Sequence, residues 1–95
     1  MNEIKHIEHG GRGAFIVKSD GQRLAEMTYV KAGDTGFIID HTEVDETLKG
    51  QGLGKDLLAA AVAYAREKGL TIYATCPFAL RELTNTPEYH DVFKP

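Results

Sequence analysis

Hydrophobic and polar residues alternate along much of the first half of the chain, with the period of β-strands. Three segments carry this pattern, and they span residues 13–18, 22–31 and 37–44. Ser19-Asp20-Gly21 separates the first two segments and is typical of a tight hairpin turn. Because the connections are short, we expect an antiparallel meander of three strands. The two faces of the second segment differ little in polarity, so its register stays open.

A helical spacing replaces this alternation in the second half of the chain. The apolar residues that share one helical stripe are Leu53, Leu57, Leu58, Ala61, Val62 and Ala65. They predict an amphipathic helix over residues 57–68 that ends at Gly69. Residues 70–75 form a fourth predicted strand, which should run parallel to the third because a helix connects them in a right-handed crossover. Short helices are expected over residues 78–83 and from Thr86-Pro87 onward.

These elements predict an α/β fold with a mixed, α+β type of sheet, in which a β-α-β unit follows the meander and short helices close the chain. With 95 residues, the chain is expected to form one domain over residues 1–95. In such a sheet, ligands bind beyond the carboxyl ends of the parallel strands. One of these ends leads into a glycine-rich segment, and the other ends at Cys76.

The glycine-rich segment, Lys49-Gly50-Gln51-Gly52-Leu53-Gly54-Lys55, lies between a predicted strand and a predicted helix. Glycines let the backbone approach an anion closely, and the free N–H groups of the helix's first turn point toward it. Lys49 and Lys55 add positive charge. A P-loop needs four residues between its glycines, but Gly50 and Gly54 enclose only three. A Rossmann loop needs a glycine in place of Lys55 and a larger sheet.

Composition and charge narrow the classes of partner. The hydrophobic share of 42% and the charged share of 26% are ordinary for a soluble globular protein. A net charge of −3 argues against a nucleic-acid partner bound through a general basic surface, and leaves room for a cationic amine. There is no apolar stretch of membrane-spanning length and no signal-peptide core, so we expect a cytoplasmic protein with no membrane partner. Its one cysteine fits a reducing compartment.

Cys76 is the candidate for chemistry at the second strand end. It precedes Pro77, which disfavours a helical conformation for Cys76 and favours one for the residues that follow, so Cys76 is expected to cap a helix. The positive end of a helix dipole stabilises a thiolate, which would make Cys76 a nucleophile. The competing interpretation is a buried cysteine that packs like Ile72 and Ala74 on the same strand face.

His41 is the candidate general base, three residues before the end of the third strand. An imidazole can accept a proton from an ammonium substrate or from Cys76 near neutral pH. Because His41 alternates in phase with Phe37 and Ile39, a core histidine bonded to the backbone is the competing interpretation. The other histidines show no metal-ligand spacing with one another or with Cys76, so no metal is expected.

Several motifs together resemble the minimal GNAT-like N-acetyltransferases, which are small stand-alone domains. The motifs are His41-Thr42-Glu43-Val44, Lys49-Gly50-Gln51-Gly52-Leu53-Gly54, Cys76 followed by the aromatic Phe78, and Pro87-Glu88-Tyr89. The similarity extends over nearly the whole chain, and Lys49 stands where the family has Gln or Arg. The chain departs from the family at Ala74 and Pro77, which flank the cysteine, and at Thr86, where the family commonly has His. The chain therefore has no histidine at that position to act as a general base.

The resemblance implies an enzyme that moves an acetyl group from acetyl-CoA to a small-molecule or protein amine. In that family the glycine segment, here residues 49–55, binds the CoA pyrophosphate, and the main chain near Glu43 and Val44 pairs with the pantetheine amides. The family's proposed catalytic cysteine corresponds to Cys76. Direct attack by the amine and transfer through acetyl-Cys76 both stay open.

Two further functions stay open at this point. The domain could bind CoA or acyl-CoA without transferring the acyl group, and its loop could bind another phosphate ligand such as a nucleotide. The acceptor amine and the oligomeric state are not encoded in any motif, and a monomer is compatible with the sequence.

Overall fold

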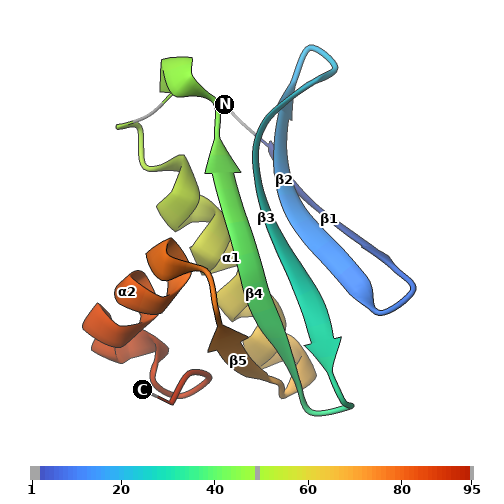
Figure 1. Ribbon diagram of the computed structural model, residues 1–95, viewed down its shortest axis with the longest axis vertical. Coiled ribbons are helices and arrows are strands. Elements are labelled where there is room, and N and C mark those ends of the chain that lie inside the picture. The colour runs from blue at the N-terminus through green and yellow to red at the C-terminus, as the bar shows by residue number, and fades with distance from the viewer. Residues whose placement is uncertain (1–2, 49, 95) are drawn as a thin grey trace.

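The computed structural model describes residues 3–48 and 50–94, whose strands form one mixed sheet in chain order (Figure 1). The strands are β1 (Glu3–His9), β2 (Arg12–Ser19), β3 (Gln22–Ala32), β4 (Gly36–Val44) and β5 (Thr71–Ala74). Strands β1 to β4 are antiparallel neighbours, and β5 pairs in parallel with β4. The predicted fold class is confirmed, and the meander has one strand more than predicted.

The additional strand is β1, at the edge of the sheet. It pairs with β2 along its whole length, from Glu3 opposite Lys18 to His9 opposite Arg12. Most of its side chains are exposed, so it lacks the alternation that predicts a half-buried strand. The turn that joins it to β2 needs glycine, because both Gly10 and Gly11 have positive φ angles, of 61° and 82°.

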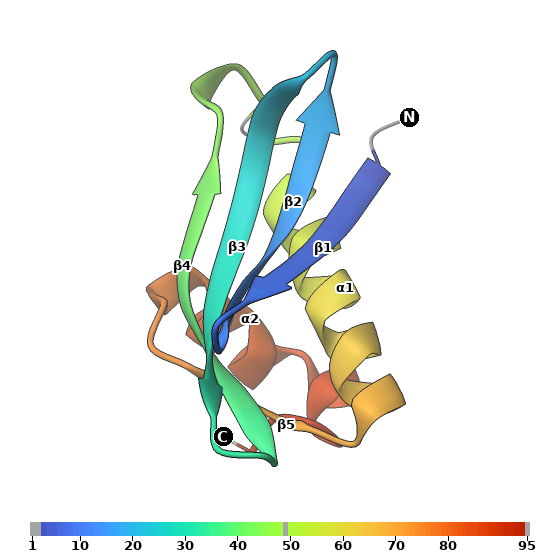
Figure 2. The ribbon, with the colours of Figure 1, turned by 90° about the vertical axis from the view of Figure 1, so that its right-hand side faces the viewer.

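Two helices, α1 (Leu53–Lys68) and α2 (Pro77–Asn85), cover the same face of the sheet. Figure 2 shows the antiparallel strands in front and both helices behind them. Short 3₁₀ turns, η1 (Glu46–Leu48) and η2 (Pro87–Tyr89), follow β4 and α2. Helix α1 ends at Gly69 as predicted but begins at Leu53 rather than at residue 57, which moves the last residues of the glycine segment into its first turn.

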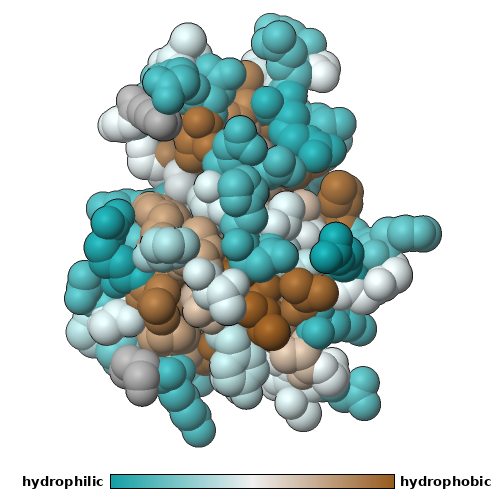
Figure 3. Space-filling model, viewed as in Figure 1, coloured by the Kyte–Doolittle hydropathy of each residue, from teal (hydrophilic) through white to brown (hydrophobic). Residues whose placement is uncertain are grey.

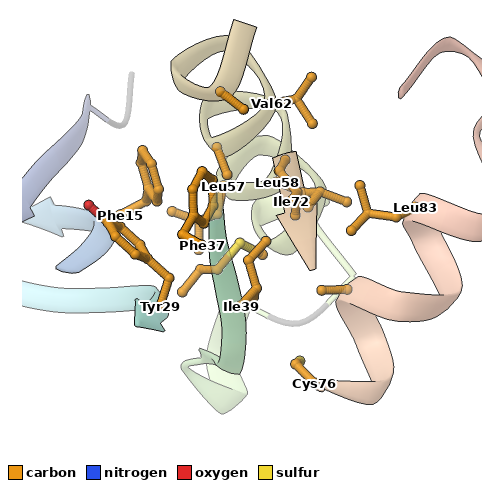
Figure 4. Packing of buried hydrophobic residues seen from close by; sticks show 14 of the residues in the cluster. Phe15, Tyr29, Phe37, Ile39, Leu57, Leu58, Val62, Ile72, Cys76 and Leu83 are labelled. Atoms are coloured by element: carbon orange, nitrogen blue, oxygen red, sulfur yellow. The ribbon is translucent and has the colours of Figure 1, made fainter. Parts of the chain in front are cut away.

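The hydrophobic core lies between these helices and the sheet. The predicted stripe of α1 is confirmed, since its buried residues are Leu53, Leu57, Leu58, Ala61, Val62 and Ala65. Figure 4 shows the stripe meeting Phe37 and Ile39 of β4 on one side and Leu83 of α2 on another. Leu57 is completely buried, and a side chain of this kind contributes about 1.5–3 kcal/mol by leaving water.

The segment after α2 returns to the outer edge of β5. Ile72 forms a parallel bridge with Phe93, and the N–H of Ile72 donates to the Val92 carbonyl at 2.7 Å. The short strand β5 therefore has a neighbour on each side.

The same segment is also bound to α1 on the surface. Nε of Arg66 in α1 donates to Oδ2 of Asp91 at 2.8 Å. This hydrogen bond lowers the pKa of Asp91.

A polar and aromatic cluster joins β1 to the core. The hydroxyl of the buried Tyr29 donates to Oε2 of Glu8 at 3.1 Å, and Nε2 of His6 lies 2.6 Å from the same hydroxyl. Because that hydroxyl has one proton, His6 must donate through Nε2–H. The imidazole also stacks on Phe15, at 4.3 Å between ring centres, and meets the edge of Tyr64. Burial lowers the pKa of His6, against the opposing effect of Glu8.

We expect His6 to make stability fall as the solution is acidified. The fold holds the pKa of His6 below the unfolded value of 6.5, so the unfolded chain binds more protons, and stability present above that value is lost as the pH falls. The free energy of unfolding in urea should drop more for the wild type than for His6→Phe between about pH 7 and pH 5. His9→Gln, at the exposed end of β1, should behave as the wild type. Equal pH slopes for the wild type and His6→Phe would contradict this role.

Candidate functional site

Strand β4 has strand neighbours on both sides only as far as Ile39. Strand β5 pairs with residues 36–39 of β4 and then ends at Ala74. The N–H groups of Thr75 and Cys76 both donate to the Ile39 carbonyl, at 3.0 and 3.2 Å, and the chain then enters α2. Figure 1 shows β4 continuing past the end of β5. Within the described residues, the edge of β4 over residues 40–44 therefore has no strand beside it on this side.

Thr42 and Val44 present their peptide groups to this open edge. The N–H of Asp45 donates to the Leu24 carbonyl of β3 at 2.8 Å. Peptide groups of an antiparallel strand alternate between its two sides, so those of Glu43 also turn toward β3, and those of Thr42 and Val44 turn away from it. Of the two residues predicted to pair with pantetheine, Val44 is thus placed for main-chain pairing and Glu43 is not.

A β-bulge in β4 decides which side chains face the helices. In the pairing with β3, Tyr29 lies opposite Ile39 but Thr28 lies opposite His41, so Asp40 is an extra residue. The Thr28 hydroxyl donates to Oδ1 of Asp40 at 2.6 Å. One extra residue shifts the alternation of all side chains that follow it.

The bulge puts His41 on the outer face of the sheet. Its side chain is 59% exposed, and its Nε2 lies 3.4 Å from Oε2 of Glu43, so the interpretation as a core histidine is wrong. Thr42 takes the inward position instead, and the Cys76 thiol donates to its Oγ1 at 3.4 Å. The structure therefore brings Cys76 together with Thr42, whereas a role of His41 as general base stays a prediction.

Cys76 caps α2, as the following proline predicts. Its backbone is extended, with φ −70° and ψ 122°, and Pro77 takes the first helical position. The N–H of Leu80 donates to its carbonyl at 2.9 Å. The side chain is only 5% exposed, so the competing interpretation of a buried cysteine is confirmed as well. Figure 4 shows Cys76 at the margin of the labelled core, where α2 begins. Cys76 is not itself among the described residues that line the neighbouring cavity, but its partner Thr42 is.

This cavity, of about 490 Å³, lies between the open edge of β4 and the start of α1. Its described lining residues are Thr42, Val44, Leu48, Gly50, Gly52, Leu53, Gly54, Lys55 and Phe78. Figure 3 shows apolar surface near the top of the molecule, over the end of β4 and the segment that follows it. A largely apolar wall with a few polar groups is typical of small-molecule and cofactor sites.

The first turn of α1 can bind an anion at this cavity. The first intrahelical bond runs from the N–H of Asp56 to the Gly52 carbonyl at 3.0 Å, so the N–H groups of residues 53–55 lack intrahelical partners. In the described part of the chain, no side chain caps this end of α1. These N–H groups and the positive end of the helix dipole favour a negatively charged ligand.

The glycine segment lines the cavity with its backbone. Gly50 and Gly52 have φ angles of 89° and 76°, which residues with a Cβ rarely adopt. Lys55 is exposed, and its Nζ lies 3.7 Å from Oε1 of Glu82 in α2. Gln51 is exposed and is not among the lining residues. Lys49, predicted to bind the cofactor, lies outside the described residues.

Hydrogen bonds to the side chain of Asp45 stabilise the turn between β4 and the glycine segment. Oδ1 of Asp45 accepts hydrogen bonds from the hydroxyl and the N–H of Thr47, at 2.6 and 2.9 Å. These two bonds lower the pKa of Asp45. The carboxylate thereby holds the first turn of η1.

Thr42, Leu48 and Phe78 all line the cavity but were not predicted as site residues, and Thr42 and Phe78 entered only as parts of the family motifs. Thr42 faces inward because of the bulge, which the alternation of residues does not reveal. Phe78 could have been found from its place in the first turn of the helix that Cys76 caps. Its ring packs against Gly54, where a Cβ would lie 2.9 Å from Cζ of Phe78.

The described residues, 3–48 and 50–94, contain no group of three or more His, Cys, Asp or Glu side chains that could hold a metal ion. In the same ranges, none of the helices has the length and apolar character needed to cross a bilayer.

Comparisons with protein families, with curated sequences and with solved structures each found relatives of this chain. The family model for GCN5-related N-acetyl-transferases matches residues 14–92. Protein NATD1 of Xenopus tropicalis is 29% identical over 83 residues, which cover 85% of this chain and 76% of that protein. The solution structure of a GCN5-like protein from Staphylococcus aureus is 40% identical, with 96% of this chain and 86% of that chain covered and a TM-score of 0.75.

A more distant neighbour shares the fold. The GNAT family acetyltransferase from Elizabethkingia anophelis, solved with acetyl-CoA bound, is 15% identical and gives a TM-score of 0.62. The match covers 78% of this chain and 51% of that one.

We expect Gly54→Ala to destabilise the protein, although alanine in a helix is normally better than glycine by about 0.5–1 kcal/mol. The new Cβ would have to displace the Phe78 ring, and overpacking of this kind costs about 1–3 kcal/mol. In a Phe78→Ala background, the same substitution should instead stabilise. Urea unfolding of the four proteins in this cycle measures the difference. Stabilisation by Gly54→Ala in both backgrounds would show that the ring does not restrict this position.

Proposed function

Because this chain belongs to the family of GCN5-related N-acetyltransferases, we propose that it transfers an acetyl group from acetyl-CoA to an amine. The observation that carries the proposal is one cavity with three features. It joins the open edge of β4, the uncapped start of α1 and, through Thr42, the Cys76 thiol. These features suit the pantetheine arm, the pyrophosphate and the thioester of acetyl-CoA, respectively.

In this proposal the pyrophosphate binds to the N–H groups at the start of α1. Gly50 and Gly52 let the backbone curve around the anion, and Lys55 adds charge from the rim of the cavity. Lys49 is proposed to contribute a second cation. The acetyl-CoA bound to the Elizabethkingia anophelis neighbour supports this choice of cofactor.

The pantetheine arm is proposed to lie along the open edge of β4. Its amides would pair with the peptide groups of Thr42 and Val44, as an added strand would. This pairing directs the thioester toward the place where Thr42 contacts Cys76.

We propose Cys76 as the acetyl carrier. Its thiolate attacks the thioester carbonyl carbon, the carbon–sulfur bond to CoA breaks, and CoA leaves as a thiolate. A deprotonated amine then attacks acetyl-Cys76, which forms the amide and returns the Cys76 thiolate. The proton that the amine loses passes to water, and His41, exposed beside Glu43 on the outer face of β4, is proposed to accept it from there. An acceptor with a cationic amine, either a small molecule or a protein, suits the net charge of −3.

Gly52→Ala should weaken acetyl-CoA binding about tenfold, because alanine disfavours a φ of 76° and the free loop would relax to a conformation that has to be reversed when the ligand binds. Calorimetric titration measures this. Gly21→Ala is the matched control, since Gly21 has a φ of 79° and open space around it in the distant turn between β2 and β3. It should lose stability without losing affinity. Unchanged affinity in Gly52→Ala would contradict the loop assignment, and stronger binding of ATP or NAD than of acetyl-CoA would overturn the cofactor.

Intact-protein mass spectrometry after exposure to acetyl-CoA tests the reaction. We expect an acetyl adduct on the wild type, none on Cys76→Ala, and a large loss of amine-dependent CoA release in that variant. Unchanged CoA release by Cys76→Ala would support direct attack by the amine. Acetyl-CoA binding with no transfer to any of a panel of amines would indicate a binding module instead of an enzyme.

A further inference from the structure

Thr42 links the cavity to the buried thiol. Thr42 is one of the residues that line the cavity, and its Oγ1 lies 3.4 Å from Sγ of Cys76, which donates the hydrogen bond. A threonine hydroxyl rotates freely and can either accept or donate. The same atom pair can therefore carry an S–H···O bond when the thiol is protonated and an O–H···S bond when it is a thiolate.

The fold places Thr42 there through the bulge in β4. Without the extra residue at Asp40, His41 would follow Ile39 on the inner face and Thr42 would point outward. The bond between Thr28 and Asp40 lies at this bulge. The position next to the thiol is thus occupied by a hydroxyl, in place of the imidazole that simple alternation would put there.

We propose that Thr42 is the positioning residue for the Cys76 nucleophile. In the resting protein its hydroxyl accepts the hydrogen bond from the thiol and holds Sγ next to a residue of the cavity wall. When the thiol proton leaves to water, the hydroxyl turns and donates to the sulfur anion. A hydrogen bond to a charged group is stronger than one between neutral groups, so Thr42 favours the thiolate that attacks the thioester. This inference rests on the proposed function, in which Cys76 carries the acetyl group.

Substitutions at Thr42 separate the effect of its hydroxyl from that of the rest of its side chain. Thr42→Val keeps the branched shape and the peptide groups of β4 but removes the hydroxyl, and Thr42→Ser keeps the hydroxyl. Thr84→Val is the matched control, because it removes a hydroxyl that donates to the Leu80 carbonyl at 2.7 Å, toward the other end of α2. Thr42→Ala replaces Thr42→Val if the latter does not fold.

The measurement is the single-turnover rate of acetyl-adduct formation at saturating acetyl-CoA, followed by intact mass. We expect Thr42→Val to slow it at least about tenfold, the lower end of the range that corresponds to a hydrogen bond to a charged group. Calorimetric affinity for acetyl-CoA should stay within about twofold, because the peptide groups of residue 42 remain. Thr42→Ser should restore most of the rate, and Thr84→Val should match the wild type. A purely structural role would not give this combination of unchanged affinity, reduced rate and rescue by serine.

The contrary outcomes are distinct. Equal adduct rates in the wild type and Thr42→Val, or no rescue by Thr42→Ser, would overturn the role of Thr42 and leave the acetyltransferase intact. If the wild type acetylates amines without forming an acetyl adduct, both the role of Cys76 as acetyl carrier and the positioning role of Thr42 would be wrong. Failure of the wild type to bind acetyl-CoA would overturn the proposed function itself, and with it this inference.

Discussion

The candidate site depends on peptide groups of β4 that have no strand partner among the described residues. Main-chain N–H and C=O groups need hydrogen-bond partners, and a strand in the interior of a sheet finds them on both sides. Strand β4 has them on both sides up to Ile39, where the Thr75 and Cys76 N–H groups share one carbonyl and the chain leaves the sheet. Beyond this point its outer groups face a cavity, and the same departure of the chain puts the Cys76 thiol at the start of α2. The open edge and the candidate nucleophile therefore have a single structural cause.

Much of this end could be predicted, because its local signals act through backbone geometry. Pro77 restricts its own φ and the conformation of Cys76, so the helix cap followed from two adjacent residues. Gly50 and Gly52 adopt the left-handed conformations that glycine permits, and the helix after them buries the stripe that its spacing predicts. The parallel pairing of β5 with β4 followed from the length of the helical connection between them.

What could not be predicted depends on contacts between residues distant in the sequence. The bulge at Asp40 is defined by the pairing with β3 and leaves no mark on the local sequence, so simple alternation put His41 in phase with Phe37 and Ile39. Strand β1 is held by pairing with β2 and by the bond between His6 and Tyr29, while most of its side chains face solvent. The fit of Phe78 against Gly54 joins two helices and is likewise invisible to local spacing.

The uncapped start of α1 also has a thermodynamic consequence. An N-cap side chain satisfies one of the first N–H groups of a helix, and glycine in its place typically costs roughly a few tenths of a kcal/mol. Gly52 has no side chain to do this, so α1 folds without that contribution. An anion bound there would supply the missing partners only in the folded state, and ligand binding to the native state alone raises the free energy of unfolding. The glycine that opens the site thus links occupancy of the site to the stability of the whole protein.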